Sequence, residues 1–151
     1  VRVQIKLYPN HRIYNQNDFV YSEVVSVEKG DNAEQVVLDF LADVNEKAIA
    51  KVRPDVPLCE LDKTARDVIT EAGYGPYFTH RLGHFIGLSE HEYGDVSSVN
   101  TRVAEAGMIF SIEPGIYLAG DTGVRIEDLV LVTEDGCEVL NHASKELEIL
   151  G

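Results

Sequence analysis

Apolar and polar residues alternate with a period of two at the start of the chain, in VRVQIKLY. Successive side chains of a β-strand point to opposite faces, so this pattern is typical of a half-buried strand. Turn-forming residues follow in PNHRIYNQND, and the strand pattern returns in FVYSEVVSV. The sequence therefore predicts a β-hairpin with a long loop over residues 1–27.

The pattern then changes to a helical period. Between Ala33 and Val52, apolar residues recur every three or four positions with Glu and Lys between them, which predicts an amphipathic helix. Prolines interrupt this pattern, and a second helical pattern begins at Leu58. We expect the second helix to end at Gly73 and Gly75, because glycine commonly terminates helices.

Strand patterns dominate the rest of the chain, over residues 108–117, 124–133 and 137–140. A hairpin, two helices and then a run of strands is the order of an α+β fold, with the helices packed on one face of a largely antiparallel sheet. Neither a repeat nor a linker interrupts the pattern, so we expect a single domain over residues 1–151.

Carboxylates interrupt two of these strands. Glu113 lies in SIEPGIY, and Glu127 and Asp128 lie in GVRIEDLVLV. A buried carboxylate is costly unless a cation or several hydrogen-bond donors face it. Strand alternation sends Glu127 and Asp128 to opposite faces, so we expect one of them in a shared site and the other in a structural role. Arg125 shares the face of Glu127 and is the alternative, ion-pairing partner for Glu113.

A cluster of histidines is the second feature of the sequence that indicates a functional site. The chain has five histidines, and His80, His84 and His91 lie together in HRLGHFIGLSEHEYG, where glycines allow a close backbone approach. Imidazole nitrogen and carboxylate oxygen together suit borderline divalent cations such as Mn, Co, Fe or Zn. The sequence therefore indicates His84, Glu113 and Glu127 as candidate metal ligands.

Composition narrows the range of partners. The net charge of −13 repels phosphate backbones and anionic lipid, which disfavours nucleic acid and membrane surfaces. No stretch has the ~20 apolar residues that a membrane span requires, and no signal-peptide pattern is present. The two cysteines have no metal or disulfide spacing, so we expect a cytoplasmic protein with free thiols.

Three motifs in order carry a family resemblance. The segments GYGPYFTHRLGHFIGLSEHE, EAGMIFSIEPGIY and GVRIEDLVLVTEDG resemble the pita-bread metallopeptidases, and they fit the Xaa-Pro dipeptidase (prolidase) and aminopeptidase P branch better than methionine aminopeptidase. The resemblance covers residues 33–151, whereas residues 1–31 form a divergent hairpin. It implies the later half of a pseudo-symmetric α+β fold, which is the C-terminal portion of a catalytic domain.

The resemblance also implies a metal centre. His84 and Glu113 would bind one metal and Glu127 would bridge two, with manganese or cobalt as the expected ions and zinc or iron as alternatives. The expected activity is hydrolysis of an Xaa-Pro peptide bond in a proline-containing peptide by a metal-activated water.

Further roles follow from the same resemblance. Glu113 would also act as the catalytic proton shuttle. His80 and His91 would be catalytic residues that bind the substrate and its tetrahedral intermediate, and Arg125 would orient the carboxylates.

The first strand departs from the family pattern, which has two aspartates there. Alignment of VQIKLY with that pattern places Lys6 at the first aspartate and Asp18 near the second, with Glu23 as a rival for it. A lysine ammonium has no lone pair and repels a dication, so Lys6 would leave one metal or none. The alternative function is therefore a degenerate, non-hydrolytic relative that binds peptide or protein.

The chain begins with Val1 inside a strand pattern. We therefore expect a segment of a larger protein. An exposed sheet edge invites pairing, so either a homodimer or association with the missing N-terminal segment is expected.

Overall fold

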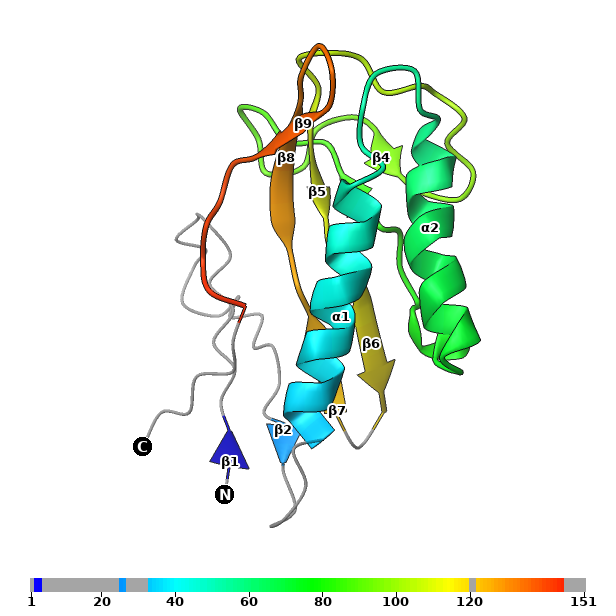
Figure 1. Ribbon diagram of the computed structural model, residues 1–151, viewed down its shortest axis with the longest axis vertical. Helices are drawn as coiled ribbons and strands as arrows, with labels where there is room; N and C mark the ends of the chain where they lie inside the picture. Colours follow the sequence, from blue (N-terminus) through cyan, green and yellow to red (C-terminus); the bar gives the residue numbers. More distant parts are fainter. Residues whose placement is uncertain (1, 4–24, 27–32, 120–121, 146–151) are drawn as a thin grey trace.

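The structure is a computed structural model that describes residues 2–3, 25–26, 33–119 and 122–145 (Figure 1). Strands β1 (Arg2–Val3) and β2 (Val25–Ser26) pair antiparallel, as the ends of the predicted hairpin should. Lys6, Asp18 and Glu23 lie outside the described residues. The roles assigned to them therefore stay predictions.

Two helices follow, α1 (Ala33–Ile49) and α2 (Leu58–Glu71), and a short 3-10 helix η1 (Gly75–Tyr77) comes after them. Helix α1 ends three residues before the predicted end at Val52. The Val52 amide already bonds the Ile49 carbonyl in a tighter i to i−3 turn, and the nearby proline prevents a longer helix. Gly73 adopts a left-handed φ of +87° just beyond α2, as the predicted glycine stop requires.

The remaining elements are short strands that pair antiparallel throughout. Their orders are β3–β4, β5–β8–β9 and β6–β7. The bounds are β3 Gly83–His84, β4 Asp95–Val96, β5 Ile109–Ile112, β6 Gly115–Leu118, β7 Thr122–Arg125, β8 Asp128–Val132 and β9 Cys137–Val139. The predictions of single strands over 108–117 and 124–133 were wrong, because each of these segments forms two strands.

Both long strands break at the same level. Ile112 pairs with Asp128 before the break, and Gly115 pairs with Arg125 after it. Pro114 has no amide N–H and so cannot continue the ladder; instead its carbonyl accepts the Ile126 N–H at 3.3 Å. The break frees the backbone of residues 113 and 127 from regular pairing at the positions where the carboxylates stand.

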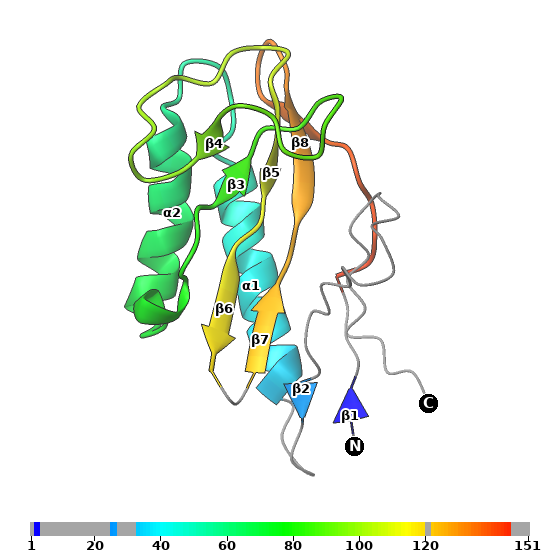
Figure 2. The same cartoon turned by 180° about the vertical axis from the view of Figure 1, so that it is seen from behind.

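The helices and the strands form two layers. Figures 1 and 2 show α1 and α2 on one face of the strands, with the opposite face open to view in Figure 2. The core between the layers is apolar and almost fully buried, and it includes Leu41, Val44, Leu58, Leu61, Ala65, Ile69, Phe110, Ile112, Val130 and Val132. The α+β fold with helices on one face is confirmed. No helix among the described residues has the length and apolar character that a membrane crossing needs.

Candidate metal centre

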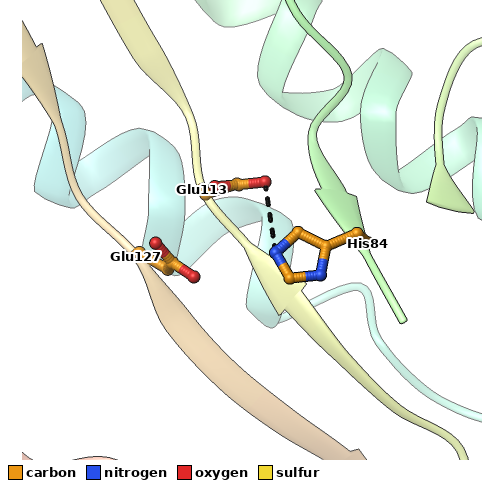
Figure 3. Close-up of side chains that lie close together, drawn as sticks. All are labelled: His84, Glu113 and Glu127. Carbon is orange, nitrogen blue, oxygen red and sulfur yellow. Dashed lines mark ion pairs between the residues drawn. The ribbon is translucent and has the colours of Figure 1, made fainter. Parts of the chain in front are cut away.

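Three side chains converge from separate segments (Figure 3). His84 ends β3, Glu113 follows β5 and Glu127 precedes β8. One potential ligand atom from each lies within 4.8 Å of the other two. His84 Nε2 is 3.9 Å from Glu113 Oε1, and both side chains are less than a tenth exposed, whereas that of Glu127 is 33% exposed.

The ring of His84 is oriented by backbone contacts. Its Nδ1 lies 3.1 Å from the Phe85 carbonyl, which can only accept, so Nδ1 carries the proton and Nε2 keeps its lone pair. The His84 amide donates to Ser111 Oγ at 3.0 Å. Burial lowers the pKa of His84, and the nearby His91 lowers it further, so the neutral, metal-binding form is favoured.

The two glutamates lie close together, and both pair with the Arg125 guanidinium. Burial raises the pKa of Glu113 to about 7, and the charge of Glu127 acts in the same direction. Arg125 opposes this, with Nε 3.6 Å from Glu113 Oε2 and Nη2 3.6 Å from Glu127 Oε2. An imidazole nitrogen and two crowded carboxylates are a donor set that fits a borderline divalent cation. The ion pair anticipated between Arg125 and Glu113 is also present.

Asp128 points away from this group. Its side chain is 2% exposed, with Oδ1 accepting from Asn141 Nδ2 at 2.8 Å and Oδ2 2.5 Å from Lys145 Nζ. Lys145 also donates to Asn45 of α1, on the helix side of the strands. Glu127 is therefore the member of the pair that lies beside Glu113, as strand alternation allows.

Two further histidines, His80 and His91, lie near these side chains. The His91 ring centroid lies 4.1 Å from that of His84, at an interplanar angle of 36°. His80 Nδ1 donates to the Arg81 carbonyl at 2.7 Å, which leaves Nε2 to accept from the Tyr117 hydroxyl at 3.2 Å. Burial is the main cause that lowers the pKa of His80.

Tyr117 also lies at this site, although its place there was not predicted from the sequence. The signal was available, because alternation along the single strand predicted over residues 108–117 would put residues 113, 115 and 117 on one face. A side chain on Gly115 would crowd the contact between Tyr117 and His80, because an added Cβ would lie 2.7 Å from the Tyr117 hydroxyl and 3.0 Å from His80 Nε2. Because glycine has no side chain, Tyr117 and His80 can contact each other.

Gly83 allows an even closer approach. A Cβ on this residue would lie 1.8 Å from the Ser111 carbonyl oxygen, which is impossible without moving the backbone. The expectation that a glycine beside the histidines permits close packing is thus met at Gly83. This packing places β3, and with it His84, directly against β5.

Comparison with known proteins agrees with the resemblance seen in the motifs. The sequence pattern of metallopeptidase family M24 matches residues 21–134 of this chain. An uncharacterized peptidase of Staphylococcus haemolyticus is 48% identical over 133 residues, which are 88% of this chain and 38% of that protein. A second curated relative, an uncharacterized peptidase of Staphylococcus aureus, is 52% identical over 111 residues, 74% of this chain and 32% of its own length.

Solved structures give the same result. The X-Pro aminopeptidase from Thermotoga maritima matches with a TM-score of 0.78 at 36% identity, over 84% of this chain and 36% of that one. Prolidase from Pyrococcus furiosus matches with a TM-score of 0.74 at 37% identity, over 80% of this chain and 36% of that one. The chain thus spans about a third of the length of these proteins.

Proposed function

Because the chain belongs to metallopeptidase family M24, we propose that it supplies His84, Glu113 and Glu127 to the metal centre of a peptidase that hydrolyses Xaa-Pro bonds. The observation that carries the proposal is the convergence of one imidazole and two carboxylates, from three segments, within 4.8 Å. The preference for proline is supported by solved neighbours that are named prolidase and X-Pro aminopeptidase. The relatives are longer than this chain, and we propose the activity for the whole protein.

The donor set decides which metals we propose. His84 Nε2 and the oxygens of Glu113 and Glu127 would hold manganese or cobalt, with zinc or iron as alternatives. When bound, such a metal activates water and polarises the scissile carbonyl. Asp18 is the proposed additional ligand that would allow a second metal, with Glu127 as the bridge.

The chain's own side chains would handle the proton and the substrate. Glu113, which lies between His84 and Arg125, would accept the proton released by the attacking water and pass it to the leaving amine. His80, which meets Tyr117, and His91, whose ring packs on that of His84, would hydrogen-bond the peptide. Arg125 contacts both carboxylates at 3.6 Å and would keep them aligned. We also propose that the chain folds as one domain and pairs as a homodimer or with an N-terminal segment.

A second candidate function is peptide binding without metal. It is favoured by Arg125, whose guanidinium already pairs with Glu113 and Glu127. Lys6, if it replaces an aspartate ligand as the sequence alignment predicts, would favour it further. On that account Lys6→Asp should raise the metal bound per chain from one or none toward two. An unaltered metal content, measured by mass spectrometry after dialysis, would remove Lys6 from the site.

Metal content and hydrolysis together test the proposal. Purified chain is dialysed, loaded with Mn²⁺ or Co²⁺ and assayed on an Xaa-Pro dipeptide and on the same dipeptide with alanine in place of proline. We expect bound metal and cleavage of the proline substrate, with both lost in His84→Ala and kept in His142→Ala, a matched change at an exposed histidine. A parent chain that retains no metal would favour the metal-free function instead.

A further inference from the structure

A buried ion pair on α2 lies next to the segment that carries His80. Asp62 is fully buried, and Arg66, one turn later, donates from Nε to its Oδ2 at 2.8 Å and from Nη2 to its Oδ1 at 3.0 Å. This two-pronged geometry uses the planar guanidinium, which a lysine cannot imitate. Lys63 and Asp67 form a pair of the same spacing on the same helix, but more than half of each side chain is exposed.

The same pair binds the backbone of residues 78–82. Arg66 donates from Nη1 to the Phe78 carbonyl at 3.0 Å and from Nη2 to the His80 carbonyl at 2.9 Å. Its guanidinium carbon lies 4.3 Å from the centre of the Phe78 ring. Asp62 Oδ1 accepts the Leu82 amide at 3.0 Å. Every second residue of the segment is thus tied to one helix.

This segment touches the candidate metal centre at two points. The Leu82 carbonyl accepts the Glu113 amide at 2.7 Å, which fixes the backbone that carries the carboxylate. The His80 ring packs edge-on against Phe78, with centroids 5.1 Å apart at 88°, and its Nε2 meets the Tyr117 hydroxyl. A movement of the segment would therefore displace both the imidazole and the carboxylate.

We propose that Asp62 and Arg66 are positioning residues, which hold the 78–82 segment so that His80 and Glu113 keep the geometry of the active site. This inference rests on the proposed function. Within the described residues, Asp62 and Arg66 contact neither His84 nor Glu127. The pair therefore acts through the backbone of residues 78–82. Five hydrogen bonds hold the segment in this way. Arg66 donates four of them, two to Asp62 and two to the backbone, and the Leu82 amide donates the fifth to Asp62.

The first test is Arg66→Lys, which keeps a positive charge beside Asp62 but removes the planar fork. Amide hydrogen exchange at Glu113 and the nuclear Overhauser effect between the rings of His80 and Tyr117 are measured by NMR in the metal-free chain. We expect Glu113 exchange to become at least about tenfold faster and the ring contact to weaken. Lys63→Arg, a swap within the exposed pair of the same helix, should change neither. Unchanged exchange and an unchanged ring contact in Arg66→Lys would overturn the inference.

A second variant separates positioning from stability. Asp62→Leu with Arg66→Met replaces the ion pair by apolar side chains of similar volume, a change that often preserves or raises stability. If the pair only stabilises the fold, this double variant should show the thermal midpoint, Glu113 exchange and ring contact of the parent. The positioning role predicts a parent-like midpoint with the NMR changes of Arg66→Lys.

Activity of the metal-loaded protein provides an independent readout. We expect kcat/KM for the Xaa-Pro dipeptide to fall about tenfold in both variants, the size typical of lost supporting contacts at metal sites. A parent chain that neither binds metal nor cleaves the dipeptide would refute the proposed function. The exchange and ring-contact measurements need no metal and no substrate, so they still decide whether Asp62 and Arg66 position the segment.

Discussion

Substitution of Glu113 by glutamine should stabilise the metal-free protein at high pH. The variant keeps the shape of the side chain and removes a charge that burial and Glu127 disfavour. The pKa of Glu113 rises from its ordinary value of 4.5 to about 7. A shift of this size corresponds to about 3 kcal/mol, at about 1.36 kcal/mol for each pKa unit. The Glu113 side chain is only 8% exposed, so screening by solvent reduces this free energy only slightly.

The sign of the pH dependence follows from proton binding. Between pH 4.5 and about 7 the folded protein holds a proton on Glu113 that the unfolded chain has released. The stability of the parent therefore falls as pH rises through this window and levels off above it. Glutamine does not titrate, so the advantage of Glu113→Gln should be near zero at pH 4.5 and reach about 3 kcal/mol above pH 8.

Thermal unfolding of dialysed protein in chelator, followed by circular dichroism across this pH range, measures the difference. For a chain of this size about 3 kcal/mol corresponds to roughly 6–12 °C in Tm. Glu105→Gln is the matched control, because Glu105 is 61% exposed and pairs only weakly across the surface with Arg102. A Glu113→Gln variant that is less stable than the parent at pH 8.5, or whose advantage does not vary with pH, would refute the reasoning.

Three further outcomes are expected. His84→Ala should abolish divalent-metal binding in calorimetry with little change in the far-UV circular dichroism, and unchanged affinity would exclude His84 as a ligand. Mn²⁺ or Co²⁺ at ~100 times its dissociation constant should stabilise the native protein by about 2.7 kcal/mol, seen as a higher Tm; no shift at millimolar metal would favour the metal-free function. Gly83→Ala should destabilise by about 3 kcal/mol or more, because its Cβ would overlap the Ser111 carbonyl. In the control Gly136→Ala the added Cβ would lie 3.9 Å from the Thr133 hydroxyl, an ordinary contact, so equal losses of stability in denaturant unfolding would contradict the argument.

The sequence predicted the two helices and the strands that follow them, but it gave no sign of η1, β3 or β4. Periodicity located both helices, since α2 begins at Leu58 and stops before Gly73 as predicted. It could not show the breaks within the two long strands. Apolar residues stand on both sides of Glu113 and Glu127, and the interruption depends on Pro114 facing residue 126 across the hairpin. Facing positions of two strands are a tertiary property that a pattern along one strand does not contain.

Candidate ligands were easier to predict than the groups that hold them. A carboxylate in an apolar strand is conspicuous, and alternation correctly separated Glu127 from Asp128. Asp62 and Arg66 gave no such signal, because an acid and a base four residues apart are ordinary on an exposed helix face. Only the fold shows that this pair is covered by residues 78–82 and bonded to their backbone.

The three donors come from three separate segments, next to β3, β5 and β8. The site can therefore exist only while all three strands are in place, both during synthesis and during unfolding. His84 approaches Glu113 only after β3 has docked on β5, and Glu127 arrives only with β8. A nascent chain therefore has no complete set of donors until β8 has left the ribosome. A metal that binds the finished arrangement alone, and not the folding transition state, would slow unfolding and leave the folding rate almost unchanged. Such a metal would lengthen the lifetime of the native state without acting as a nucleus for its formation.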